Sequence, residues 1–296
     1  ATVGAARRLW DSWLDGDLIA DAQEGRFVAD PHAGAYAYHD RFFDIRGRFN
    51  VPRSPQGRPV LFQAGSSDPG RDLAARHAEG IYAVAYDLPA AQEYYSSVKA
   101  EVARAGRDPE AVVVMPGLVT YVGRTHEEAL AKQERVDRLL PVEQSLAQLS
   151  TFVEQDCAQW DLDAPVPTLP PLEEFTGPQG RYGTILRIIE AERPTVRQLL
   201  GRLAAGGGHC TMVGTPESIA GRMQEWLENG GADGFNLMPP VQPDSLTDFV
   251  DLVVPELQRR GLFRTAYEGR TLRENLGLPF PETRWAALRR TTHAAE

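Results

Sequence analysis

The chain has 296 residues, 42% of them hydrophobic and 24% charged, with a formal net charge of −10. This balance is typical of a globular protein with a substantial core, and the acidic surface argues against nucleic acids and anionic membranes as partners. No apolar run is long enough to predict a membrane span, and Cys157 and Cys210 fit no zinc or redox motif, so we expect two buried thiols in a reducing, cytoplasmic setting.

The first segment, "ATVGAARRLWDSW", predicts an amphipathic helix with Leu9, Trp10 and Trp13 among its apolar residues. It lacks the apolar core of a signal peptide. Because it begins without Met in the middle of a helical pattern, we expect the chain to be part of a longer one. Residues 16–58 are rich in turn formers, with one short strand expected at about 42–45.

Apolar runs and helical patterns then alternate. Continuous apolar runs predict buried strands at 59–65, 81–86 and 111–123, each followed by a helix. The helix after the third strand begins at Thr125, and Glu128 three residues later predicts a capping box.

Residues 141–193 break this alternation with a helical stretch at about 142–160 and the proline-rich "DAPVPTLPPLEEFTGPQG". We expect an insertion that lies outside the repeat. The alternation resumes with the following segments: helices at 195–205 and 215–230, a short apolar run at 209–214, a strand at 234–240, a helix at 244–261 and an extended tail from 262. The pattern predicts a parallel β/α architecture; four convincing strands fit an open doubly wound sheet or half of an eight-stranded barrel, and periodicity does not choose between them.

The most informative turn is Ala64-Gly65-Ser66-Ser67, between the first buried strand and its helix. A helix that begins at a Gly/Ser turn offers backbone N–H groups and the positive end of its dipole to a phosphate, and Arg71 adds charge one turn later. The alternative is a plain strand-to-helix connection with a serine N-cap and no ligand. Local chemistry leaves both interpretations open.

Three histidines occur in settings that bear on function. His209 follows a glycine cluster, where it faces a pocket mouth or is a loop histidine bonded to backbone; His39 lies among aromatic residues and His77 on an apolar helix face, and both are interpreted as structural. The histidines and acids show no metal-ligand spacing, and no nucleophile elbow is present. We therefore expect no metal.

Several motifs, taken in order, resemble one family: "LWDSW", "GRFNVPRSPQGRPVLFQAGSSDPGRDLAARHAEGIYA", "VGTPESIA", "ADGFNLMPP" and "FVDLVVPELQRRGLFRTAYEGRTLRENLGLP". They resemble the nitrilotriacetate, dibenzothiophene-sulfone and pristinamycin-synthase group of flavin-dependent monooxygenases, in the bacterial-luciferase-like superfamily. The resemblance extends from about residue 3 to residue 279, and the combination and order of the motifs are its specific part.

The resemblance implies a (β/α)8 TIM-barrel type of fold with insertions. It implies one luciferase-like monooxygenase domain over 1–296, with an insertion at about 141–193 and a tail at about 262–296. The implied activity is monooxygenation of a small organic substrate by reduced FMN and O2, with the flavin supplied by a separate NAD(P)H-dependent reductase. The implied residues are Ala64, Gly65, Ser66, Ser67 and Arg71 for the FMN phosphate. We also expect Arg181, Tyr182 and His209 to line the substrate pocket, with His209 a catalytic candidate.

Members of this family carry further strands before "LWDSW". The chain is therefore expected to contain only the second half of the barrel, strands 5 to 8, and to form a homo-oligomer or to associate with the missing N-terminal half. Two alternatives remain. One is an incomplete half-barrel that acts as a binding or assembly module, and the other is a relative that uses coenzyme F420.

Overall fold

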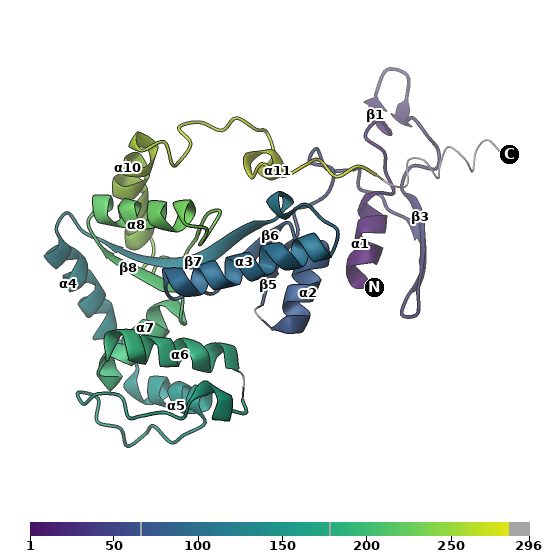
Figure 1. Cartoon of the computed structure of the whole chain (residues 1–296). Helices are drawn as coiled ribbons and strands as arrows, with labels where there is room; N and C mark the ends of the chain where they lie inside the picture. Colours follow the sequence, from purple (N-terminus) through teal and green to yellow (C-terminus); the bar gives the residue numbers. More distant parts are fainter. Residues whose placement is uncertain (66, 178, 284–296) are drawn as a thin grey trace. The chain divides into compact units, whose positions relative to one another are not determined.

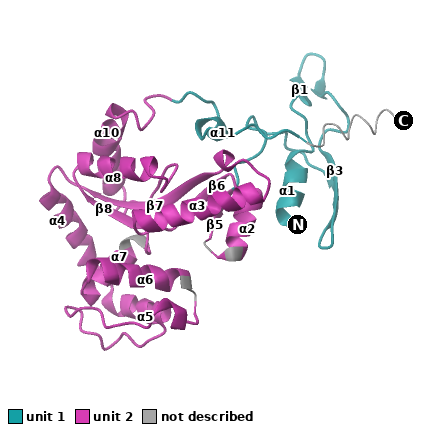
Figure 2. Ribbon diagram, in the orientation of Figure 1, with its two compact units in different colours: residues 1–61, 267–296 teal, residues 62–266 magenta. Residues whose placement is uncertain are grey.

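The computed structural model describes residues 1–65, 67–177 and 179–283. The chain divides into two compact units (Figures 1 and 2): unit 1 comprises residues 1–61 and 267–296, and unit 2 comprises residues 62–266. The predicted strand–helix alternation lies in unit 2.

Unit 1 is built from short elements. They are α1 (Thr2–Trp10), β1 (Leu18–Asp21), β2 (Arg26–Val28), β3 (Ala35–His39), β4 (Asp44–Arg48) and α11 (Leu272–Asn275). Strand β1 pairs with β2, and β3 with β4, as antiparallel hairpins. Only one strand was expected here. The β3–β4 hairpin reverses at Asp40, whose carboxylate accepts hydrogen bonds from the backbone N–H groups of Phe42 and Phe43 at 2.7 and 2.8 Å.

The tail is not uniformly extended, because α11 interrupts it. Thr271 and Glu274 cap this helix reciprocally. Arg273, 1% exposed, donates to the carbonyl oxygens of Gln56, Arg58 and Pro279 at 3.1, 3.3 and 3.0 Å. Two of the motifs behind the family resemblance, around residues 47–60 and 267–279, are therefore joined through one buried guanidinium.

Unit 2 contains the remaining elements. They are β5 (Phe62–Ala64), α2 (Asp68–His77), β6 (Gly80–Ala83), α3 (Leu88–Arg104), η1 (Pro109–Ala111), β7 (Val113–Val122), α4 (His126–Asp137), α5 (Val142–Val153), η2 (Leu172–Glu174), α6 (Gln179–Glu192), α7 (Val196–Gly206), β8 (Cys210–Gly214), α8 (Pro216–Glu228), β9 (Asn236–Leu237), α9 (Asp244–Asp248), η3 (Phe249–Val253) and α10 (Val254–Arg259). In the part of the chain that the structure describes, no helix has the length and apolarity to cross a bilayer.

The strands of unit 2 form one parallel sheet, in the order β5-β6-β7-β8, with β9 also paired to β7. This confirms the predicted parallel β/α organisation. The count of four strands was wrong, because the run 209–214, treated only as a short apolar stretch, contains β8. Strand β7 spans ten residues, so it pairs with β6 over residues 113–116 and with β8 over residues 118–122.

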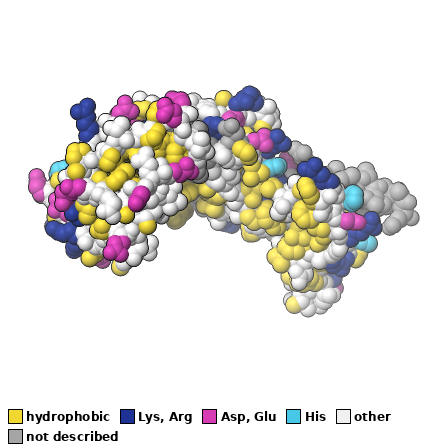
Figure 3. Space-filling view, turned by 90° about the horizontal axis from the view of Figure 1, so that it is seen from below, with side chains coloured by type: hydrophobic (Ala, Val, Ile, Leu, Met, Phe, Trp, Pro, Cys, Tyr) yellow, Lys and Arg dark blue, Asp and Glu magenta, His cyan; other side chains and the backbone are white. Residues whose placement is uncertain are grey.

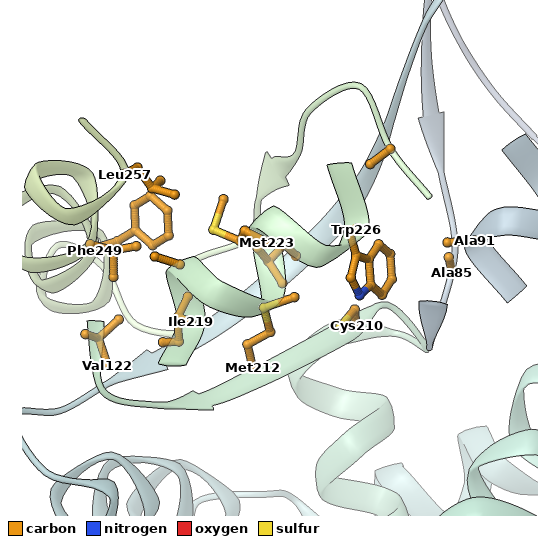
Figure 4. Close-up of a cluster of buried hydrophobic side chains, with 14 residues drawn as sticks. Ala85, Ala91, Val122, Cys210, Met212, Ile219, Met223, Trp226, Phe249 and Leu257 are labelled. Carbon is orange, nitrogen blue, oxygen red and sulfur yellow. The ribbon is translucent and has the colours of Figure 1, made fainter. Parts of the chain in front are cut away.

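Helices α2 and α3 cover one face of the β5–β6–β7 part of the sheet. Their buried residues pack with Ile81, Val112 and Val114. A second cluster joins β7 and β8 to α8 and to the 249–257 helix, with Met223, Trp226 and Phe249 among its members (Figure 4). In these two clusters, helices pack against a face of the sheet, as expected in a β/α fold.

The long helix expected at 244–261 is present with one irregularity. Residues Phe249–Val253 form a π-helical turn between α9 and α10. Pro255 is the second residue after this turn and has no N–H to donate to it, which is a physical reason for the altered hydrogen bonding.

Helices α5, α6 and α7 pack around a cluster of their own (Figure 1). This cluster includes Leu149, Cys157, Ile185 and Leu199, so it takes in the predicted insertion and also α7, beyond the expected limit of 193. The helical stretch expected at 142–160 is shorter, because α5 ends at Val153 and the next residue, Glu154, has a left-handed φ of 53°. Both cysteines are free and buried, as predicted.

Candidate cofactor and substrate site

The turn after β5 has the open backbone that a phosphate site needs. Ala64, Gly65 and Ser67 are exposed, and Gly65 has a φ of +149°, a conformation that residues with a Cβ rarely adopt. A Cβ added to Gly65 would lie 3.0 Å from Nε2 of Gln63. Ser66, the fourth residue of the predicted phosphate turn, lies outside the described residues.

Ser67 is the N-cap of α2. Its Oγ accepts a hydrogen bond from the backbone N–H of Gly70 at 3.3 Å, and Pro69 contributes no N–H to the first turn. The helix start therefore offers fewer backbone donors than the sequence interpretation assumed. The Ser67 hydroxyl still has its own proton to donate, so capping and phosphate binding are compatible roles.

Arg71 lies one turn into α2 and is held in place. Its Nη1 is 3.3 Å from Oγ of Ser97, and its Nε is 3.8 Å from Oε1 of Glu101. The residues present fit a phosphate monoester: an exposed glycine turn, a hydroxyl donor, a helix N-terminus and a nearby guanidinium.

A hollow of about 570 Å³ begins beside Arg71. Its walls come from the loop after β6, the first turns of α3, residue Leu172 and helix α6; they are formed by Arg71, Val84, Ala85, Tyr86, Ala90, Glu93, Tyr94, Leu172, Gly180, Arg181, Gly183, Thr184, Arg187 and Gly207. Its volume is in the range of small-molecule sites. The structure thus brings two predicted site residues, Arg71 and Arg181, to one hollow.

Tyr182, predicted to line a substrate pocket, does not reach the hollow. Its side chain is fully buried in the α5–α6–α7 cluster, where its hydroxyl donates to the carbonyl oxygen of Pro170 at 2.6 Å and its ring stacks on Phe175 at 3.8 Å. On a helix, the neighbouring residue points about 100° away, so Arg181 lines the hollow while Tyr182 joins the core.

His209 lies just before β8 and is 8% exposed. Its Nε2 is 3.3 Å from the hydroxyl of Tyr82, and the two rings stack with centroids 5.2 Å apart. It is therefore packed against side chains rather than bonded to loop backbone, and among the described residues its Nδ1 has no hydrogen-bond partner. A Cβ on Gly117, in the middle of β7, would collide with the imidazole ring.

Sequence reasoning missed the partners of His209. The Tyr82 hydroxyl also donates to Sδ of Met238 at 3.0 Å, so residues from β6, the end of β9 and the segment before β8 meet over β7. One signal was present: a glycine inside an apolar strand marks a close approach, as Gly117 does here. Both other histidines were interpreted as structural. His77 is half-buried, whereas His39 is exposed, with Nδ1 3.7 Å from Asp44.

Burial lowers the pKa of His209 below its usual value, and the positive charge of Arg181 lowers this pKa further. The unfolded chain binds the His209 proton more readily, so stability contributed by this residue is present above the ordinary histidine pKa and is lost as pH falls through the depressed one. We expect His209→Phe to flatten the fall in stability on acidification, by less than about 1.4 kcal/mol per pH unit, the limit for one proton. Urea unfolding at a series of pH values measures this.

The control for that experiment is His39→Gln, at a histidine whose side chain is 79% exposed. An acid dependence that is the same in wild type and in His209→Phe would contradict the prediction.

The sheet face opposite α2 and α3 is partly open. Ile81 packs toward these helices, so Tyr82 and, across the sheet in register, Ala64 point to the other face. Phe62, two residues before Ala64, is 48% exposed, and Val84, two residues after Tyr82, is 43% exposed. Apolar side chains also occupy broad areas of the surface seen in Figure 3.

A parallel α/β sheet with a phosphate-type turn at the carboxyl end of one strand defines a class of ligand-binding β/α protein. The family profile of luciferase-like monooxygenases matches residues 3–234. The chain belongs to the luciferase-like monooxygenase family, which confirms the predicted resemblance.

Individual relatives agree with this assignment. The chain is 44% identical over 281 residues to nitrilotriacetate monooxygenase component A of Aminobacter aminovorans, covering 95% of this chain and 62% of the relative. Among solved structures it resembles DmoA from Hyphomicrobium sulfonivorans, with a TM-score of 0.80, 28% identity and coverage of 98% and 62%. It also resembles a riboflavin lyase determined with modified FMN and riboflavin, with a TM-score of 0.73, 31% identity and coverage of 94% and 61%. The chain thus spans about three fifths of the length of these relatives.

Proposed function

We propose that this chain carries the flavin-phosphate site of a monooxygenase that uses reduced FMN and O2 to oxygenate a small organic substrate. The observation that carries the proposal is the exposed glycine turn after β5, followed one helical turn later by Arg71 in the wall of the hollow, in a chain of the luciferase-like family. The FMN-containing riboflavin lyase among the structural relatives supports a flavin rather than coenzyme F420.

In this proposal Ala64, Gly65, Ser66 and Ser67 surround the phosphate, and Arg71 adds positive charge. The flavin supplies the oxygen chemistry when it is bound. The protein's own contribution is to fix the phosphate, to orient the ring toward the hollow and to keep water from the reacting atoms. His209, with Tyr82, is a candidate to contact substrate or flavin over β7.

We further propose that β5, β6, β7 and β9 correspond to strands 5 to 8 of a (β/α)8 barrel, with β8 an additional strand on β7. The exposed Phe62 and Val84 support this, since the inner face of a barrel is normally filled by side chains. A second copy or the remaining part of the protein would then cover this face. The name "component A" of the Aminobacter relative supports a second component. In this proposal that component is a separate NAD(P)H-dependent flavin reductase, and both proteins are in the cytoplasm.

The test is titration of FMN and of reduced FMN into the protein, together with O2 uptake in the presence of an external flavin reductase and candidate substrates. We expect saturable FMN binding and O2 uptake that leads to oxygenated product. Binding without product would favour the alternative, a binding or assembly module. Tighter binding of coenzyme F420 than of FMN would refute the flavin assignment.

A further inference from the structure

The charges around the hollow are unevenly compensated. Arg187 is at its rim, with Nη2 3.0 Å from Oε2 of Glu93, and Arg71 faces Glu101. Arg181 differs: among the described residues no carboxylate lies within ion-pair distance of it. The hollow therefore contains one guanidinium whose charge the described part of the chain does not neutralise.

Arg181 is nevertheless held in a defined position. Its Nη1 donates to the carbonyl oxygen of Gly207, and its guanidinium lies over the ring of Phe152 at 5.0 Å. These contacts fix the plane of the group and leave Nε and Nη2 as donors. A fixed guanidinium with two adjacent donors matches the geometry of a carboxylate.

The glycine cluster before His209 makes room for this arginine. Gly207 and Gly208 have φ values of +57° and +93°. A Cβ on Gly207 would lie 3.1 Å from Nη1 of Arg181, and a Cβ on Gly208 would lie 2.9 Å from Cγ2 of Thr184. The motif that first drew attention to His209 thus also shapes the wall that presents Arg181.

We propose that Arg181 binds a carboxylate group of the substrate, and hence that the substrate is an organic acid. The identification of the bound carboxylate as the substrate rests on the proposed function. The carboxylate site itself does not depend on that function. The flavin phosphate already has Arg71 and the turn after β5, whereas Arg181 comes from α6, in the separate helical cluster. The apolar Val84 and Leu172 in the same walls favour a molecule that combines a carboxylate with a hydrocarbon part.

The test uses citrate as a carboxylate probe and trimethyl citrate as its uncharged counterpart, in calorimetric titrations at low ionic strength with and without FMN. Wild type is expected to bind citrate and not the ester. Arg181→Gln is expected to weaken citrate binding about tenfold or more, the usual effect of losing a hydrogen bond between charged groups, and to leave FMN affinity unchanged. Arg181→Lys keeps the positive charge but not the paired guanidinium donors, and its citrate affinity is expected to lie between those of wild type and Arg181→Gln.

Arg197→Gln is the matched control, because it removes the same charge from an exposed arginine that pairs with Asp163. Citrate binding that is absent from wild type, unaffected by Arg181→Gln, or equal to that of the ester would overturn the proposal. Loss of FMN affinity in Arg181→Gln would assign this arginine to the flavin phosphate and overturn it too. Citrate binding that depends on Arg181 in a protein without FMN affinity would instead refute the proposed function and uphold the carboxylate site.

Discussion

Replacing Gly65 with valine is expected to abolish measurable FMN binding. The φ of +149° at this residue is strained for any side chain, at a cost of roughly 1–3 kcal/mol. A β-branched side chain would also crowd the Gln63 amide, 3.0 Å from the position of a Cβ, and keep the phosphate away from the backbone. Ser67→Ala loses one hydroxyl donor, worth about 1.5–3 kcal/mol against a charged group. We expect Gly65→Val to be the more damaging of the two in a calorimetric FMN titration.

Gly230→Val is the matched control for backbone strain. Gly230 lies in the same unit with a φ of +69°, and a Cβ there has no neighbour within 4 Å. Urea unfolding of both variants separates lost stability from lost binding. If Gly65→Val binds FMN like wild type, the phosphate does not bind at this turn.

The sequence predicted those elements that a single local signal determines, such as a continuous apolar run or an N-cap residue. Continuous apolar runs predicted β6 and β7, because a strand buried on both faces needs no alternation. The same pattern predicted β5, although Phe62 and Ala64 are exposed in this part of the chain. Thr125 was predicted as an N-cap, and its Oγ accepts from the backbone N–H of Glu128 at 3.2 Å. The reciprocal half of that capping box is different: the Glu128 carboxylate accepts from the backbone of Arg124 at 2.9 Å. Side-chain geometry at a helix start depends on the preceding turn, which spacing alone does not report.

The rest depended on contacts between distant segments. Strand β8 has only five residues, and it forms by pairing with residues 118–122 of β7, beyond the part of β7 that pairs with β6. Tyr182 and Arg181 are adjacent in sequence, yet packing sends one into a core and the other into the hollow. Tyr82 and Met238 belong to two of the motifs behind the family resemblance, but nothing in the sequence pairs them or Gly117 with His209, and only the fold brings these residues together.

Replacing Arg273 with alanine is expected to unfold unit 1 while leaving unit 2 intact. The three clusters of buried apolar side chains found among the described residues all lie within residues 62–266. Unit 1 instead relies on buried polar groups, such as the Trp13 indole, which donates to the carbonyl oxygen of Phe49 at 2.8 Å, and Arg53, whose Nη1 is 2.7 Å from Asp15. Order in unit 1 is therefore sensitive to the loss of any one of these groups.

Removing the Arg273 side chain leaves the carbonyl oxygens of Gln56, Arg58 and Pro279 without this donor, at about 1–3 kcal/mol for each buried group that finds no other partner. Hydrogen exchange measured by mass spectrometry should show fast exchange through residues 1–61 in Arg273→Ala and unchanged protection in β7 and α8. Arg270→Ala, at an exposed arginine of the same tail, is the control and should exchange like wild type. Unit 1 would lose three hydrogen bonds from this one substitution. Exchange in unit 1 that matches wild type would therefore mean that the Arg273 guanidinium does not hold the tail to residues 56–58.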